Sequence, residues 1–144
     1  MNKFVYRFNN KDSKKSFNSK DILGGKGANL AQMAGLNLPV PPGFTISTKI
    51  CEFFYKNNKK IPKKVIQQTK KEINIIEKIT KKKFGDLSNP LLVSVRSGSR
   101  VSMPGMMDTV LNLGLNDKTV IALKNKTSNG RFAKDSYRRF IQMY

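Results

Sequence analysis

Cationic and hydroxyl side chains follow a short apolar run within the stretch Leu91–Leu115, LLVSVRSGSRVSMPGMMDTVLNLGL. Residues 91–95 have the composition of a buried strand, and Arg96 and Arg100 come directly after it, among serines and a glycine. Arginine offers a planar fork that matches phosphate oxygens, and glycine lets backbone N–H groups approach an anion closely. The stretch therefore predicts a strand that ends in a phosphate site. Two arginines after a strand are, however, also typical of an ordinary protein surface.

A glycine-rich turn that carries a lysine, Leu23–Gly27 (LGGKG), precedes a predicted helix over residues 28–33. The N–H groups and the dipole at a helix start attract an anion, and Lys26 adds a positive charge on a flexible stem. The glycine spacing differs from that of a P-loop, and no Lys-Ser/Thr pair follows. From the spacing alone, a phosphate cradle and a plain structural turn both remain open.

A sulfur-rich segment, Met103–Met107, follows the second arginine. Methionine is flexible and polarisable, so three of them in five residues could fill an irregular gap in a core. Proline and glycine within the same segment instead favour a loop. Both readings stay open on composition.

Three stretches of the chain together resemble pyruvate, phosphate dikinase. They are Leu23–Thr48, Leu91–Leu115 and Arg131–Tyr144, in the order and at the spacing of that family. The pair LGGKGANL and VPPGF is shared with phosphoenolpyruvate synthases, whereas SMPGMMDT and DSYRRFIQMY are more particular to the dikinase.

This resemblance implies an α/β (α+β) fold, the amino-terminal portion of an ATP-grasp-type nucleotide-binding domain that is truncated here. It implies a role in an ATP-dependent phosphotransferase that passes a phosphoryl group to a histidine carried elsewhere. By the same resemblance, Lys26 and Arg96 hold nucleotide phosphates and Arg139 supports the same cluster. Gly105 and Met107 would belong to a loop that closes over ATP, where glycine permits movement and methionine packs softly around the nucleotide.

Several parts of the dikinase chemistry are absent from this sequence. There is no histidine, so the chain cannot carry the phosphohistidine. The family's acidic Mg²⁺ ligands lie further along the domain, and Asp108 and Asp135 are the only carboxylates within the matching motifs. We therefore expect ATP as the cofactor, no metal site in this chain and no turnover by the chain alone. A separate chain that carries the rest of the dikinase is the partner that would complete the site.

The composition bounds the remaining function classes. The 144 residues suffice for one modest domain, and the single Cys51 excludes an internal disulfide, suits a reducing compartment and is expected to be a buried, inert thiol. The formal charge of +19 raises the alternative of a small cationic nucleic-acid-binding protein. However, 22 of the 28 basic residues are lysines, as A/T-rich codons would give, whereas five of the six arginines lie from Arg96 onward. No apolar run reaches the ~20 residues that cross a bilayer, which favours a cytoplasmic protein without membrane contact.

The helices and strands that must position these residues can be predicted from the periodicity of apolar residues and from the residues that start and end such elements. No linker or repeat divides residues 1–144, so we expect a single unit. Thr48 and Asp117 are expected to cap helices, and the long helix is expected to bury one isoleucine-rich face. That face comprises Ile66, Thr69, Ile73, Ile76 and Ile79. Strands are predicted at 4–8, 44–47, 91–95 and 108–115, and helices at 28–33, 48–55, 62–83, 120–124 and from 131 to the last residue.

Overall fold

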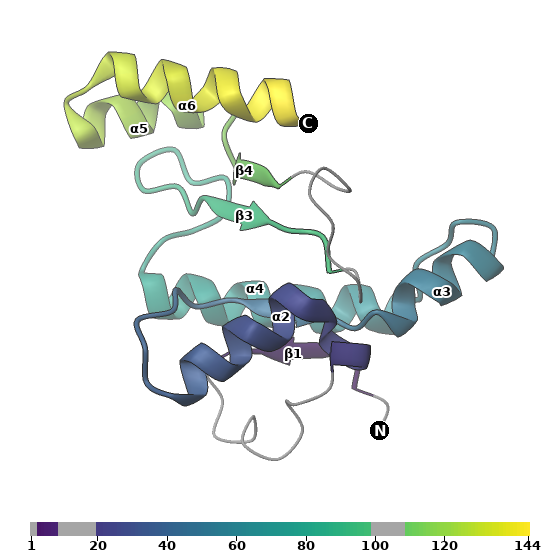
Figure 1. The fold of residues 1–144 in the computed structure, drawn as a ribbon. Helices are drawn as coiled ribbons and strands as arrows, with labels where there is room; N and C mark the ends of the chain where they lie inside the picture. Colours follow the sequence, from purple (N-terminus) through teal and green to yellow (C-terminus); the bar gives the residue numbers. More distant parts are fainter. Residues whose placement is uncertain (1–2, 9–19, 99–108) are drawn as a thin grey trace. The chain divides into compact units, whose positions relative to one another are not determined.

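The computed structural model describes residues 3–8, 20–98 and 109–144, which contain both helices and strands (Figure 1). The expected mixed α/β class is confirmed. The described residues form two compact units: the first holds residues 3–8, 20–76 and Gly98, and the second holds residues 77–97 and 109–144.

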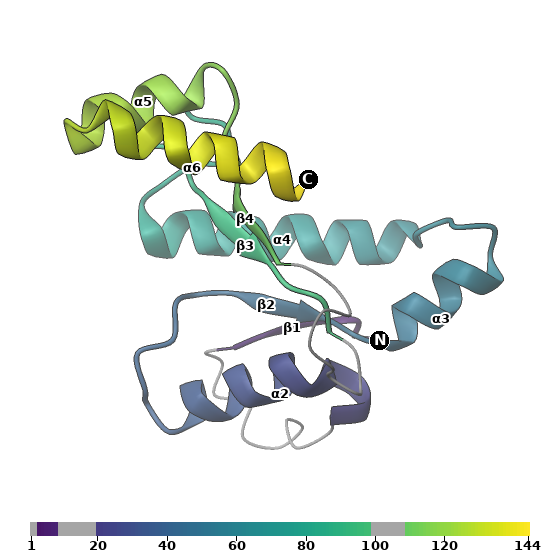
Figure 2. The ribbon, with the colours of Figure 1, turned by 45° about the horizontal axis from the view of Figure 1, so that its top comes forward.

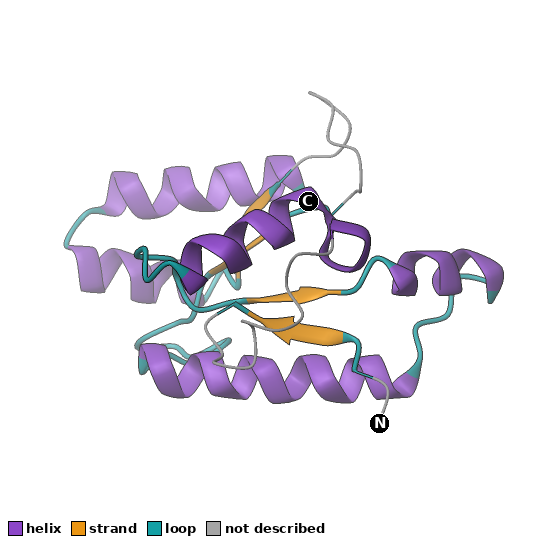
Figure 3. Ribbon diagram, turned by 60° about the horizontal axis from the view of Figure 1, so that its bottom comes forward, coloured by secondary structure: helices purple, strands orange, loops and turns teal. Residues whose placement is uncertain are grey.

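The first unit is built on a two-stranded sheet. The predicted strands are present as β1 (Val5–Arg7) and β2 (Phe44–Ile46), which pair antiparallel. Helix α2 (Lys20–Gly35) lies on one side of the strand pair and helix α4 (Lys63–Thr80) on the other (Figure 3). The small core between α2 and the strands consists of Leu23, Ala28 and Ala31, with Tyr6 and Ile22 packed against them.

The buried side of α4 differs from the predicted isoleucine face. Val65 and Ile76 are buried, but Ile66 and Ile79 are 42% and 56% exposed. The reason is that the helix meets β1 with polar side chains, which turns its apolar stripe partly towards solvent.

Two polar residues of α4 fix its position against β1. The Oε1 atom of Gln68 accepts hydrogen bonds from the backbone N–H groups of Phe4 (2.9 Å) and Val5 (3.1 Å). Glu72 forms an ion pair with Arg7, with 2.7 Å between Oε2 and Nε. The hydrogen bond to Glu72 raises the pKa of Arg7. An unpaired buried donor is costly. Hydrogen bonding to the amides of Phe4 and Val5 therefore outweighs the burial of every isoleucine of α4.

Two expectations about the segment after β2 are wrong. Helix α3 (Lys49–Lys56) does follow Thr48, but the Thr48 hydroxyl donates to the backbone carbonyl of Asp21 and makes no capping hydrogen bond. Cys51 in α3 is exposed and not buried. Its helix has no buried residue at all, so the thiol has no core to enter.

The second unit pairs a strand ladder with a helical hairpin. Strand β3 (Val93–Val95) pairs antiparallel with β4 (Val110–Leu113), as the apolar runs predicted, with an irregular register between them. Helix α6 (Gly130–Met143) packs on β4, and α5 (Thr119–Thr127) lies beside α6 (Figure 2). Gly114 leaves β4 with a φ of 117°, and a Cβ there would lie 2.6 Å from the carbonyl oxygen of Leu91, so only glycine fits.

Asparagines lie at or just before the starts of both helices of the second unit. Asn116, and not the predicted Asp117, holds the start of α5: its Oδ1 accepts from the N–H groups of Lys118 and Thr119, each at 2.9 Å. Asp117 instead accepts a hydrogen bond from the Tyr137 hydroxyl, 2.8 Å away. None of the helices in the described ranges is long and apolar enough to cross a membrane.

Candidate phosphate-binding site

The lysine of the glycine-rich turn stands just after a kink inside α2. The predicted turn does not precede the helix: α2 already begins at Lys20, and Gly24 breaks it with φ 69° and ψ 169°. Lys26 lies two residues later, half-buried, and makes no hydrogen bond or ion pair with another described residue. Its ammonium group is thus available to an anion.

The kink fits against the chain that follows the arginine-bearing strand. An ideal Cβ at Gly24 would lie 2.7 Å from the carbonyl carbon of Gly98, within the first unit. Further along the helix, a Cβ at Gly27 would lie 2.8 Å from Oγ1 of Thr45 in β2. Two glycines therefore allow α2 to approach backbone and side chains more closely than any other residue would.

Arg96 comes directly after β3 and belongs to the second unit. Its side chain is exposed and forms no ion pair within the described part of the chain. Ser97 beside it is half-buried. The guanidinium group thus follows the strand as predicted, but the strand is not buried as expected, because Ser94 and Val95 of β3 are exposed.

Arg139 lies on α6 and is held by a carboxylate one turn earlier. Its Nε donates to Oδ2 of Asp135 at 2.8 Å, while Arg138 donates to Oδ1 of the same carboxylate from Nη2 (2.7 Å) and Nε (3.1 Å). Arg138 also donates from Nη1 to Gln142 at 2.7 Å. The hydrogen bond from Arg138 and the two nearby positive charges lower the pKa of Asp135, so this carboxylate is ionised at neutral pH.

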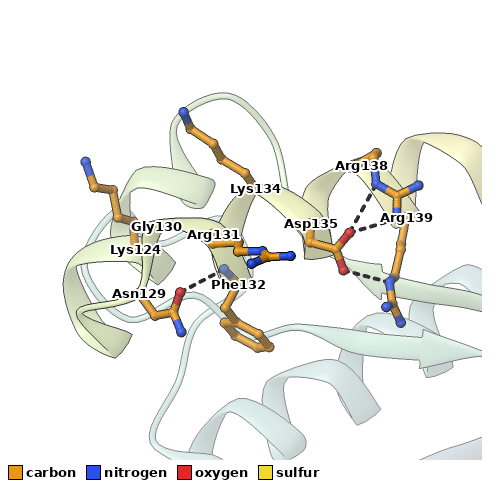
Figure 4. Close-up of a pocket in the computed structure, with 9 residues that line it drawn as sticks. All are labelled: Lys124, Asn129, Gly130, Arg131, Phe132, Lys134, Asp135, Arg138 and Arg139. Atoms are coloured by element: carbon orange, nitrogen blue, oxygen red, sulfur yellow. Dashed lines mark hydrogen bonds and ion pairs between the residues drawn. The ribbon is translucent and has the colours of Figure 1, made fainter.

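These side chains line an open hollow on the helical hairpin (Figure 4). Five cationic side chains surround it, with Asp135 as the only carboxylate among the lining residues. They are Lys124, Arg131, Lys134, Arg138 and Arg139, and Asn129, Gly130 and Phe132 complete the lining. Such an excess of positive charge at one surface is suited to a polyanion.

The predicted site residues are distributed over both units. Lys26 lies in the first, while Arg96 and Arg139 lie in the second, where Arg96 does not line the hollow around Arg139. Gly105 and Met107, predicted to form the closing loop, lie outside the described residues.

Residue reasoning missed two groups at this site. Asp135 was recognised as a motif carboxylate but not as the partner of both arginines, and Gln142 was not considered. The signal was present in the spacing, because residues three and four apart on a helix are neighbours and Asp135 stands three and four before Arg138 and Arg139.

The donor set fits a phosphate group better than a metal ion. Lysine and arginine donate hydrogen bonds to phosphate oxygens, whereas Mg²⁺ requires oxygen ligands. Within the described ranges, no three histidine, cysteine, aspartate or glutamate side chains are grouped as metal ligands would be. The residues present therefore fit the phosphates of a nucleotide and not the metal that accompanies it.

Known proteins match the chain along its whole length. Residues 20–82 match the family model described as "Pyruvate phosphate dikinase, AMP/ATP-binding domain". The chain is 55% identical over all 144 residues to a pyruvate, phosphate dikinase of Rhizobium meliloti (strain 1021), 53% identical to one of Rickettsia conorii (strain ATCC VR-613 / Malish 7) and 52% identical to one of Clostridium symbiosum. In each case the match covers all of this chain and 16% of the relative's length. These relatives give no support to the alternative of a nucleic-acid-binding protein.

Proposed function

Because this chain belongs to the pyruvate, phosphate dikinase family, we propose that it supplies phosphate-binding residues to the ATP site of a dikinase-type phosphotransferase. The chain spans 16% of the length of the relatives that it matches, so it represents one part of such an enzyme. In this proposal ATP is the ligand, and the phosphoryl group passes to a histidine outside this chain, which has none.

The observation that carries the proposal is the close approach of Gly24 to Gly98. Lys26 stands two residues after Gly24, and Arg96 stands two residues before Gly98. Two residues of chain span at most about 7 Å, so the backbone of Lys26 lies within that distance of Gly24 in the first unit. That Lys26 and Arg96 bind neighbouring phosphates of one nucleotide is part of the proposal.

The proposed roles follow from what each side chain can donate. Lys26 and Arg96 bind phosphate oxygens, and Arg139 adds a second guanidinium to the same anion. Gly105 and Met107 belong to the loop that covers the nucleotide. Phosphoryl transfer depends mainly on positioning and on neutralising charge, so converging cations are the contribution that this chain makes to the chemistry. When bound, Mg²⁺ neutralises further phosphate charge, and its acidic ligands come from outside this chain.

The wider architecture is part of the same proposal. Both compact units would belong to one nucleotide-binding domain of the ATP-grasp type, in the cytoplasm. The remaining part of the enzyme, supplied by a separate chain, would complete the ATP site. Interconversion of ATP, phosphate and pyruvate with AMP, pyrophosphate and phosphoenolpyruvate is then an activity of the assembled enzyme and not of this chain by itself.

Nucleotide binding by the chain can be measured as a thermal shift. Ligand that binds only the folded state raises the melting temperature, so we expect ATP·Mg²⁺ at millimolar concentration to stabilise the chain. A hydrogen bond to a charged group contributes about 1.5–3 kcal/mol, so Lys26→Gln, Arg96→Gln and Arg139→Gln should each weaken ATP binding roughly tenfold or more.

The matched control is Lys63→Gln, which removes one positive charge from an exposed position on α4. Long-range charge alone would make all four variants equal. Absence of any shift with the unmodified chain, or equal losses in Lys63→Gln and the site variants, would overturn the proposal.

A further inference from the structure

We propose that Asp135 is a positioning residue, which holds the guanidinium of Arg139 so that its two terminal nitrogens face an incoming polyphosphate. The inference deepens the proposed function and rests on it, because the ligand is the phosphate chain of the same nucleotide. It assigns different roles to two arginines that are neighbours in the sequence.

Arg138 already uses all three of its nitrogens in hydrogen bonds to side chains of α6. Its Nε and Nη2 donate to Oδ1 of Asp135, and its Nη1 donates to Oε1 of Gln142. These bonds anchor Arg138 along the surface of α6. We therefore assign it to holding the carboxylate and not to binding the anion.

Arg139 uses only one of its three nitrogens. Its Nε donates to Oδ2 of Asp135, and neither terminal nitrogen bonds to another described residue. A guanidinium is planar, so fixing Nε fixes the direction in which Nη1 and Nη2 point. Those two nitrogens form the end of the fork that binds two phosphate oxygens at once.

Arg139 needs a partner such as Asp135 because its side chain is exposed to solvent. The Arg139 side chain is 57% exposed, and a long exposed side chain occupies many rotamers in solution. Binding an anion with a free arginine would cost the entropy of ordering that side chain. Asp135 removes part of this cost before the ligand arrives, because Arg138 in turn anchors the carboxylate (Figure 4).

Simple electrostatics predicts the opposite result when Asp135 is neutralised. A carboxylate beside a phosphate site repels the ligand, so removing its charge should strengthen polyphosphate binding. Positioning predicts that the same change weakens binding, because Arg139 loses its orientation. The sign of the effect therefore separates the two explanations.

The experiment is calorimetric titration of the whole chain with ATP and with inorganic tripolyphosphate. We expect Asp135→Asn to weaken binding of both about three- to fivefold, the range that exposed ion pairs reach. Asp135→Glu can still contact a residue four positions later and should restore at least half of the lost affinity. Arg138→Lys should change affinity less than twofold, whereas Arg139→Lys should weaken it about as much as Asp135→Asn does.

Glu52→Gln is the matched control, because it makes the same change in net charge on α3. Titrations at low and at physiological salt show how much of any change is long-range charge, which salt screens. A nitrogen-detected spectrum of the Arg139 Nε–H group should shift in Asp135→Asn and return towards its original position in Asp135→Glu. If Asp135 had a merely structural role, adding ligand would change the Arg139 Nε–H signal equally in Asp135→Asn and in the unmodified chain.

The outcomes separate this inference from the function on which it rests. If the unmodified chain binds but Asp135→Asn binds equally well or more tightly, the positioning role is overturned and the phosphate site stands. If the unmodified chain binds neither ATP nor tripolyphosphate, both are overturned. Weaker binding by Asp135→Asn with rescue by Asp135→Glu supports both.

Discussion

Arg138 and Arg139 show how hydrogen-bond partners decide what a side chain can do. They share one carboxylate, yet only Arg139 keeps its terminal nitrogens unused by described residues. Recognition of a motif with two adjacent arginines does not reveal which one meets a ligand. The contacts on the helix surface make that distinction.

A pH-dependent prediction concerns Asp86, in the turn after α4. The hydroxyl of Ser88 and the N–H groups of Ser88 and Asn89 donate to its carboxylate, which lowers its pKa to about 2. The unfolded value is about 3.9, so the stabilisation that this turn provides is present above that value. It is lost as the pH falls towards about 2.

The measurement is a carboxyl ¹³C titration of Asp86. We expect a midpoint near 2, and we expect Ser88→Ala to raise it because the hydroxyl donor is the largest cause of the shift. Ser128→Ala, at a position with no hydrogen bond to this turn among the described residues, should leave the midpoint unchanged. An ordinary midpoint for Asp86 in the unmodified chain would contradict the geometry of the turn.

Sequence reasoning located β1 to β4 and the principal helices. Its assignment of Lys26, Arg96 and Arg139 to a phosphate site stays a prediction. It did not identify the short polar residues that hold these elements together. Asn116, and not Asp117, holds the turn that leads into α5, because its amide oxygen accepts from two N–H groups at once. Composition cannot choose between neighbouring asparagine and aspartate residues, since both are good caps.

At the scale of secondary structure, the kink in α2 is the feature on which the proposed site depends. The sequence predicted a glycine turn before a helix, whereas the helix continues on both sides of Gly24. The physical reason is tertiary: the backbone of Gly98 occupies the space where a side chain would be. A contact between residues so far apart in the chain leaves no signal in local periodicity.

Substituting Gly24 tests this role of the kink. Gly24→Ala would require alanine to adopt a φ of 69° and would press its Cβ against Gly98, so we expect it to destabilise the chain by about 1–3 kcal/mol. Gly25→Ala is the matched control, because a Cβ there meets nothing within 4 Å and alanine favours the helix. It should be neutral or stabilise by up to about 1 kcal/mol.

Urea denaturation of both variants gives the difference directly. If Gly24→Ala is as stable as Gly25→Ala, the backbone contact between Gly24 and Gly98 does not constrain α2. The support that this contact gives to the proposed role of Lys26 would then be lost.

At the scale of the whole molecule, the chain carries a large positive charge and exposes apolar side chains on its last helix. Ile141 and Tyr144 are 59% and 88% exposed, and the relatives of this chain are about six times longer, since it covers 16% of them. In the function proposed above, a polypeptide that comprises the rest of a dikinase would complete the ATP site.

Reconstitution tests this whole-molecule proposal. We expect the chain alone to form no AMP from ATP above a protein-free blank. Adding a polypeptide that comprises the remaining part of the Rhizobium meliloti relative should restore pyruvate- and phosphate-dependent AMP formation. Arg139→Gln should reduce the restored rate at least tenfold. AMP formation by the chain without the added polypeptide would contradict the expectation.

The contact of Gln68 with β1 has a consequence for association between copies. Exposed strand amides act as templates on which a neighbouring molecule can add a strand. In this protein one side-chain oxygen already accepts from two consecutive amides, those of Phe4 and Val5. A second molecule that extended the sheet there would first have to break both hydrogen bonds. A single glutamine side chain thus adds a barrier to intermolecular pairing, beside the protection that a short edge strand already gives.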